Sequence, residues 1–120
     1  MLVVKVWCLP KTTEELLQEL HKKIVAAVAR VEGIGIKQES QMVCIFPSDM
    51  MSYGLGEEII IEVTDMYEGL RFSEEKLKWT RYLLAESIGK VVRAAFPDAS
   101  TIECRVFPRV PRQEYWCSSI

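Results

Sequence analysis

The chain has 120 residues, of which 49% are hydrophobic and 27% are charged, with a formal net charge of −2. This length and balance are typical of one soluble globular domain that folds around its own core. No basic run of five or six residues occurs, which argues against nucleic-acid binding. No apolar run approaches the roughly 18 residues that span a bilayer, which argues against a membrane protein. The first ten residues contain Lys5 and no small-residue cleavage site, so we expect a strand there and a cytoplasmic protein.

The four cysteines and the single histidine do not predict a metal site. Cys8, Cys44, Cys104 and Cys117 form no C-x-x-C pair, and three of them lie in apolar, strand-like runs. We therefore expect buried free thiols that behave as small hydrophobic side chains. His21 lies in a lysine-rich helical stretch, and a metal would have no second imidazole. We expect no bound metal and no cofactor.

The first half of the chain predicts a strand, a helix and a strand. Residues 2–9 are rich in β-branched side chains, and Pro10 ends this strand. Thr12 and Glu15 have the spacing of a capping box, and apolar residues then recur at helical intervals, which predicts a helix over about 13–31. Residues 41–46 predict the second strand.

The second half repeats this order. Residues 57–66 have a continuous apolar centre, which predicts a strand. Ser73 followed by two acidic residues is typical of a helix start, and Pro97 ends this helix. Residues 101–107 predict the fourth strand, and residues 108–120 form a C-terminal tail.

The element order predicts an α/β (α+β) fold in a single domain over 1–120. Residues 1–47 form the first β-α-β unit and residues 57–107 form the second. Such crossovers place parallel strands in one sheet with the helices on one face, so we expect a four-stranded mixed sheet with two helices. Both a ferredoxin-like fold and the tautomerase fold satisfy this pattern.

Three short patches resemble members of the tautomerase superfamily. The segment 46–54 (FPSDMMSYG) is similar to the loop after the second strand in macrophage migration inhibitory factor. The segment 71–76 (RFSEEK) followed by 83–86 (LLAE) resembles the second helix of malonate semialdehyde decarboxylase. Pro97-Asp98, a strand, and Trp116 twelve residues after Cys104 resemble the family's C-terminal strand and tail. The resemblance covers nearly the whole chain in element order and is confined to these patches in residues.

The resemblance implies a homotrimer with sites between neighbouring subunits. The sequence agrees, because two helices cover one sheet face and an apolar second face requires another cover. Family chemistry depends on an N-terminal proline whose amine moves a proton between carbon and oxygen of an α-keto acid. This chain has Leu2 instead, so the α-amine of Met1 becomes the catalytic candidate, displaced by one residue. A primary α-amine has a pKa of about 7.7–8.0, which burial lowers.

The resemblance also implies residues that bind substrate. Lys37 lies near the position of a substrate-binding lysine, one residue out of register, and Arg71 lies near an arginine that binds a carboxylate. Glu103 and Arg105 share one face of the fourth strand, where residues of a neighbouring subunit's site project. Trp116 would wall the pocket. Each of these residues also has a purely structural interpretation. Lys37 could be a solvated loop lysine, and Arg71 a surface arginine. Glu103 and Arg105 could form a solvent-exposed ion pair, and Trp116 could pack the tail onto a neighbour.

Two functions follow from these residues. One is a tautomerase-superfamily protein that binds or isomerises a small α-keto or unsaturated carboxylic acid at a subunit interface. The other is a non-catalytic module for small-molecule binding or protein interaction on the same trimeric scaffold, which the missing proline favours. Whether the protein is an enzyme, an isomerase without the usual proline, is left open by the sequence.

Overall fold

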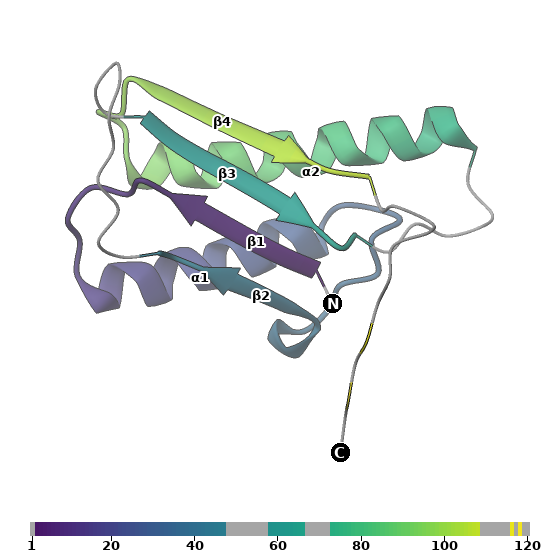
Figure 1. Cartoon of the computed structure of the whole chain (residues 1–120), viewed down its shortest axis with the longest axis horizontal. Helices are drawn as coiled ribbons and strands as arrows, with labels where there is room; N and C mark the ends of the chain where they lie inside the picture. Colours follow the sequence, from purple (N-terminus) through teal and green to yellow (C-terminus); the bar gives the residue numbers. More distant parts are fainter. Residues whose placement is uncertain (1, 48–57, 67–72, 109–115, 117, 119–120) are drawn as a thin grey trace.

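The computed structural model describes residues 2–47, 58–66, 73–108, 116 and 118. Within these ranges the two halves have the expected element order (Figure 1). The elements are β1 (Leu2–Trp7), α1 (Glu14–Ala29), η1 (Glu39–Gln41), β2 (Met42–Ile45), β3 (Glu58–Thr64), α2 (Glu74–Ala95) and β4 (Thr101–Val106).

The strand order of the sheet is β2-β1-β3-β4. β1 and β2 are parallel, β3 and β4 are parallel, and the two central strands β1 and β3 are antiparallel. Each β-α-β unit thus pairs its own two strands side by side. A ferredoxin-like fold is a split β-α-β arrangement, in which another strand separates the two parallel strands of a unit. The strand order excludes that alternative and confirms the mixed four-stranded sheet.

The core lies between the sheet and the two helices, which both cover the same face (Figure 1). Along β1 and β3 the side chains alternate between fully and partly buried, as strand geometry requires. The fully buried set on the covered face includes Val4, Val6, Leu20, Ile24, Val28, Ile59, Ile61, Val63, Leu84, Ile88 and Val92. The expected placement of both helices on one face is confirmed.

The first helix begins one residue later than the capping-box interpretation requires. Thr13, not Thr12, is the N-cap, and its hydroxyl accepts a hydrogen bond from the Leu16 backbone N–H at 3.2 Å. The Thr12 hydroxyl instead donates to the Thr13 carbonyl oxygen at 3.0 Å. The capping-box prediction was therefore wrong in register: both threonines have a usable hydroxyl, and the backbone turn selects the second.

Two of the strands end earlier than the sequence predicts, because the backbone turns into the left-handed region. Cys8 has φ of +66° directly after β1, and Asp65 has φ of +60° directly after β3. A positive φ is incompatible with an extended strand, so the ladder stops there. The predicted strands over 2–9 and 57–66 are correct in their centres and too long at their ends.

No helix within the described residues is long and apolar enough to cross a membrane.

Candidate functional site

Two of the predicted site residues, Lys37 and Arg105, lie near the same end of the sheet. β1 and β2 begin at this end, and β3 and β4, which run in the opposite direction, finish there (Figure 1). α2 also begins there. Lys37 precedes β2 by a few residues, and Arg105 is the last residue but one of β4. The topology therefore brings Lys37 and Arg105, which are far apart in the sequence, to the same end of the sheet.

Glu103 and Arg105 lie on the face of the sheet that the helices leave open. The residues of β4 alternate between exposed and half-buried, and Cys104 and Val106 pack against the core from the other face. A guanidinium nitrogen of Arg105 lies 3.0 Å from a carboxylate oxygen of Glu103, and both side chains are about half exposed (52% and 50%). The expected shared face is confirmed, and the two groups form an ion pair.

Arg105 also extends a row of charges across the open face. It stands opposite Glu62 of β3, which in turn stands opposite Lys5 of β1. Side chains at paired positions share a face and lie about 5 Å apart at Cβ. The row is thus positive, negative and positive over three strands. The positive charge of Arg105 is therefore partly balanced by two neighbouring carboxylates, those of Glu103 and Glu62.

Lys37 lies at the opposite edge of the sheet. Its backbone N–H donates to the side-chain oxygen of Gln41 at 2.6 Å, and the Gln38 N–H donates to the same oxygen at 3.0 Å. The Gln41 amide thus fixes the backbone before β2, while Lys37 itself is exposed. β1 and β3 separate β2 from β4, a span of about 14 Å. Within one chain Lys37 and Arg105 therefore do not meet on one small ligand.

The other predicted site residues are Met1, Arg71 and Trp116. Met1 and Arg71 lie outside the described residues. Trp116 is described, and 85% of it is exposed, so within this chain it does not wall a pocket. Its predicted role at a pocket requires a contact with another subunit.

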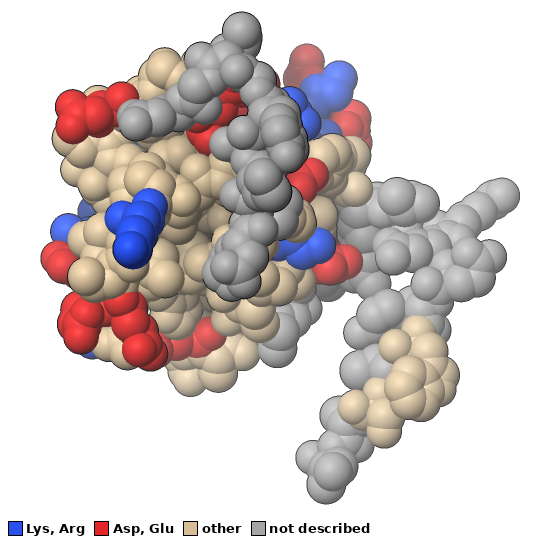
Figure 2. Space-filling view, turned by 60° about the vertical axis from the view of Figure 1, so that its left-hand side comes forward, with Lys and Arg blue, Asp and Glu red and all other residues tan. Residues whose placement is uncertain are grey.

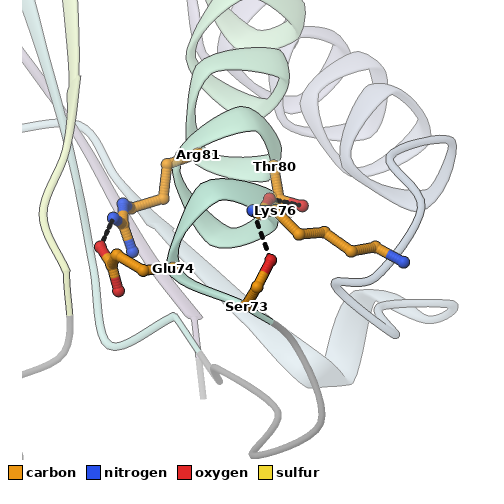
Figure 3. A network of polar contacts seen from close by, with 5 residues as sticks. All are labelled: Ser73, Glu74, Lys76, Thr80 and Arg81. Atoms are coloured by element: carbon orange, nitrogen blue, oxygen red, sulfur yellow. Dashed lines mark hydrogen bonds and ion pairs between the residues drawn. The ribbon is translucent and has the colours of Figure 1, made fainter.

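The first turns of α2 contain an enclosed arginine, Arg81, that the sequence did not single out. Ser73 caps the helix, its hydroxyl accepting from the Lys76 N–H at 3.2 Å, and the Thr80 hydroxyl donates to the Lys76 carbonyl at 2.9 Å (Figure 3). Arg81 and Glu74 form an ion pair at 2.9 Å. Only 12% of the Arg81 side chain is exposed, which makes it the more enclosed member of the pair. No sequence pattern marks this arginine as enclosed, because Glu74 and Arg81 are seven residues apart and only the folded structure brings them together.

The thiols within the described residues are structural. Cys8, Cys44 and Cys104 are free and partly buried, as predicted; Cys117 lies outside the described residues. Burial raises the pKa of Cys44 and of Cys104 to about 12. Because the thiolate is the nucleophile, these two side chains are poor candidates for covalent chemistry near neutral pH.

Figure 2 shows charged side chains of both signs on the face in view, some of them adjoining one another, among uncharged residues. Within the described ranges, no three His, Cys, Asp or Glu side chains gather closely enough to hold a metal ion. The candidate site is thus defined by the Glu103–Arg105 pair and its position at the shared end of the sheet.

No protein-family model and no curated protein sequence matches the chain. Solved structures do match. A macrophage migration inhibitory factor-like protein from Entamoeba histolytica is 16% identical, with a TM-score of 0.59 over 99% of this chain and 96% of that one. A 5-carboxymethyl-2-hydroxymuconate isomerase from Deinococcus radiodurans R1 is 17% identical, with a TM-score of 0.52 over 99% and 88%. A fused 4-OT solved as an asymmetric trimer is 13% identical, with a TM-score of 0.57 over 88% and 86%.

These proteins are members of the tautomerase superfamily, and they share the fold of this chain over nearly its full length. The predicted resemblance is confirmed as a likeness of fold. At these identities the residues of the site have to be argued from the chain itself.

Proposed function

We propose that the chain forms a homotrimer that binds a small α-keto or unsaturated carboxylic acid between subunits and isomerises it. The observation that supports this proposal is the position of Arg105: an exposed cation on the open sheet face, at the end where β1 and β2 begin. The likeness of fold to a 5-carboxymethyl-2-hydroxymuconate isomerase supports the reaction class.

Arg105 would hold the substrate carboxylate. A guanidinium offers several N–H donors, so it can keep its bond to Glu103 and still donate to a carboxylate. Glu103 would then orient the guanidinium. Arg71 and Lys37 would supply further positive charge, and Trp116 would close the pocket from the tail.

Met1 would supply the base. In its neutral form the α-amine would take a proton from the carbon next to the keto group and deliver it to the enolate oxygen, which gives the enol. Ketonisation would run the same transfer in reverse, from the enol hydroxyl to that carbon. Burial lowers the pKa of an α-amine, so a buried amine at this position would be neutral in a useful fraction of molecules near pH 7. No cofactor enters this step.

The separation of the cations supports a trimer. Lys37 and Arg105 lie at opposite edges of one sheet, so a single ligand reaches both only where β2 of one subunit meets β4 of the next. The fused 4-OT with the same fold was solved as a trimer. The half-buried apolar residues of the open face would gain the cover that the helices do not give.

A second candidate is binding without catalysis on the same scaffold, and Leu2 favours it. Leu2 is only 3% exposed and pairs with Met42, so position 2 belongs to the core-facing side of β1. A residue in that role is selected for packing rather than for chemistry. The protein would then hold a carboxylate as a sensor or an interaction module.

The test follows the ketonisation of enol phenylpyruvate by ultraviolet absorbance, with protein whose retention of Met1 is checked by intact mass. We expect turnover by the wild type and a loss of about 10- to 100-fold in kcat/KM for Arg105→Ala, the usual cost of one charged hydrogen bond. Lys23→Ala on α1 is the matched control and should be unchanged, since Lys23 is an exposed cation paired with Glu19.

A binding measurement with phenylpyruvate distinguishes the second candidate function from the first. Phenylpyruvate that binds with Arg105 dependence but is not turned over favours the non-catalytic function. If the wild type neither binds nor converts the compound, both candidates fail for aromatic keto acids, and a wild type that stays monomeric contradicts the trimer.

A further inference from the structure

The outer side of α2 has a line of residues that the proposed function does not use. They recur at intervals of three or four: Glu75, Trp79, Tyr82, Glu86 and Lys90. This spacing puts them on one face, opposite the buried residues Thr80, Leu84, Ile88 and Val92. The line therefore points away from the sheet. We call these five residues the α2 outer face.

Two large aromatic side chains form the centre of the α2 outer face. Trp79 is 60% exposed and Tyr82 is 56% exposed. Their rings stack, with centroids 5.5 Å apart and planes inclined by 21°. Single exposed apolar residues are common, but a stacked Trp–Tyr pair joins two of them into one patch. Trp and Tyr are also the residues that interfaces favour most.

A polar contact lies at one end of this patch. The Glu86 carboxylate accepts a hydrogen bond from the Lys90 ammonium at 2.6 Å. This hydrogen bond and the charge of Lys90 lower the pKa of Glu86, so the pair is intact at neutral pH. A side chain that is already restricted loses less conformational entropy when a partner binds. The stacking of the Trp79 and Tyr82 rings restricts both side chains in this way.

The charges at the two ends of the α2 outer face have opposite signs. Glu75 lies in the first turn, and Lys90 lies fifteen residues later, about 22 Å along the helix. An identical helix laid antiparallel places its Lys90 beside Glu75 and its Glu75 beside Lys90, with both aromatic pairs in the middle. A parallel helix would instead oppose like charges.

We propose that the α2 outer face docks on the same face of a second copy of this chain, as an antiparallel helix pair about a twofold axis near Tyr82. The contact is isologous, so each copy supplies the same residues. One helix pair buries less than the roughly 1,000 Å² of a stable interface, so the association is weak and depends on concentration. It uses the side of the molecule away from the open sheet face, and it does not depend on the proposed function.

The experiment is sedimentation velocity over about 1–200 μM, with mass photometry at the dilute end. We expect the wild-type mass to double as concentration rises, from one to two copies or, if the sheet faces trimerise, from three to six. Trp79→Ser should raise the dissociation constant at least about tenfold, as for a hot-spot aromatic. Circular dichroism melting shows that the variant is folded.

Charge variants test the antiparallel orientation. Glu75→Lys and Lys90→Glu should each weaken the doubling, and the Glu75→Lys/Lys90→Glu double variant should recover it above either single variant. Lys22→Glu is the matched control, because Lys22 is an exposed lysine of α1 and not of α2. A wild-type mass that never doubles, a doubling that survives Trp79→Ser, or equal weakening by Lys22→Glu would each overturn the proposal.

Discussion

The two faces of the sheet are built from the same strands and differ sharply in chemistry. On the covered face of the central strands, Val4, Val6 and Ile61 are fully buried against the helices. On the open face, the neighbouring positions Lys5 and Glu62 stand opposite each other and are only half buried. Alternation along each strand thus separates a core from a mixed surface within one residue step.

The two faces also differ in what lies against them. The covered face is apolar throughout and is completed by helices of the same chain. The open face combines charges with apolar side chains such as Trp7 and Ile60, which stand opposite each other. The side-chain nitrogen of Trp7 is buried without a hydrogen-bond partner among the described residues. The open face is therefore a mixed surface of charged and apolar side chains, whereas the covered face is apolar.

A large expected effect at neutral pH comes from truncating adjacent residues of β3 that face opposite ways. Ile61→Ala removes a fully buried side chain, so its free energy of unfolding should fall by about 3 kcal/mol, within the usual 2–5 kcal/mol for such cavities. Ile60→Ala, on the open face, should cost distinctly less at low protein concentration. Urea unfolding at 1 μM measures both.

Repeating the two measurements at higher protein concentration tests whether another copy covers the open face. If another copy covers the open face, the cost of Ile60→Ala should grow as concentration rises, while that of Ile61→Ala should not. Equal costs at every concentration would mean that the two faces are buried alike within one chain, and the comparison would fail.

An alkaline pH series tests the covered face by its thiols. Burial raises the pKa of Cys44 and Cys104 from an ordinary 9.0 to about 12. Between pH 9 and 12 the unfolded chain therefore releases protons that the folded chain retains. The free energy of unfolding should fall with rising pH in this range, by up to about 1.4 kcal/mol per pH unit for each thiol. Below pH 9 both states hold the proton and the contribution is constant.

The Cys44→Ala/Cys104→Ala variant isolates this contribution from the titration of lysines and tyrosines. Its stability at pH 7 sets the reference, and its decline from pH 9 to 11 should be shallower than that of the wild type. Parallel declines would show that the two thiols ionise as readily in the folded protein as in the unfolded one.

Most of the fold could be predicted from the sequence, because it follows from local patterns. Within the described residues, the alternating and continuous apolar runs located each strand, and the apolar spacing of α1 and α2 located these two helices. Several boundaries were missed by one or two residues because backbone conformation decided them. For example, positive φ at Cys8 and Asp65 ended two strands, and Thr13 replaced Thr12 as the cap. The strand order, which distinguished two folds, depends on long-range pairing that periodicity does not encode.

Less of the candidate site could be predicted, because its geometry depends on where distant segments meet. The shared face of Glu103 and Arg105 followed from strand period alone. The separation of Lys37 from Arg105 across the sheet did not, since it results from the strand order. Arg81 was overlooked because an arginine on a helix is usually a surface residue, and only its packing shows otherwise.

The smallest expected effect concerns the open-face ion pair. Glu103 and Arg105 are half exposed, and pairs of this kind contribute about 0–1 kcal/mol to stability. Arg105→Ala should therefore change the free energy of unfolding by less than about 1 kcal/mol, whereas Arg81→Ala, which removes an enclosed cation, should cost more. Both are measured by urea unfolding at pH 7. A small cost at Arg105 would mean that its loss of carboxylate binding reports on the ligand site. A large loss of stability would mean that Arg105 is a structural residue. The open face would then stabilise the fold as the covered face does, and the two faces would differ only in polarity.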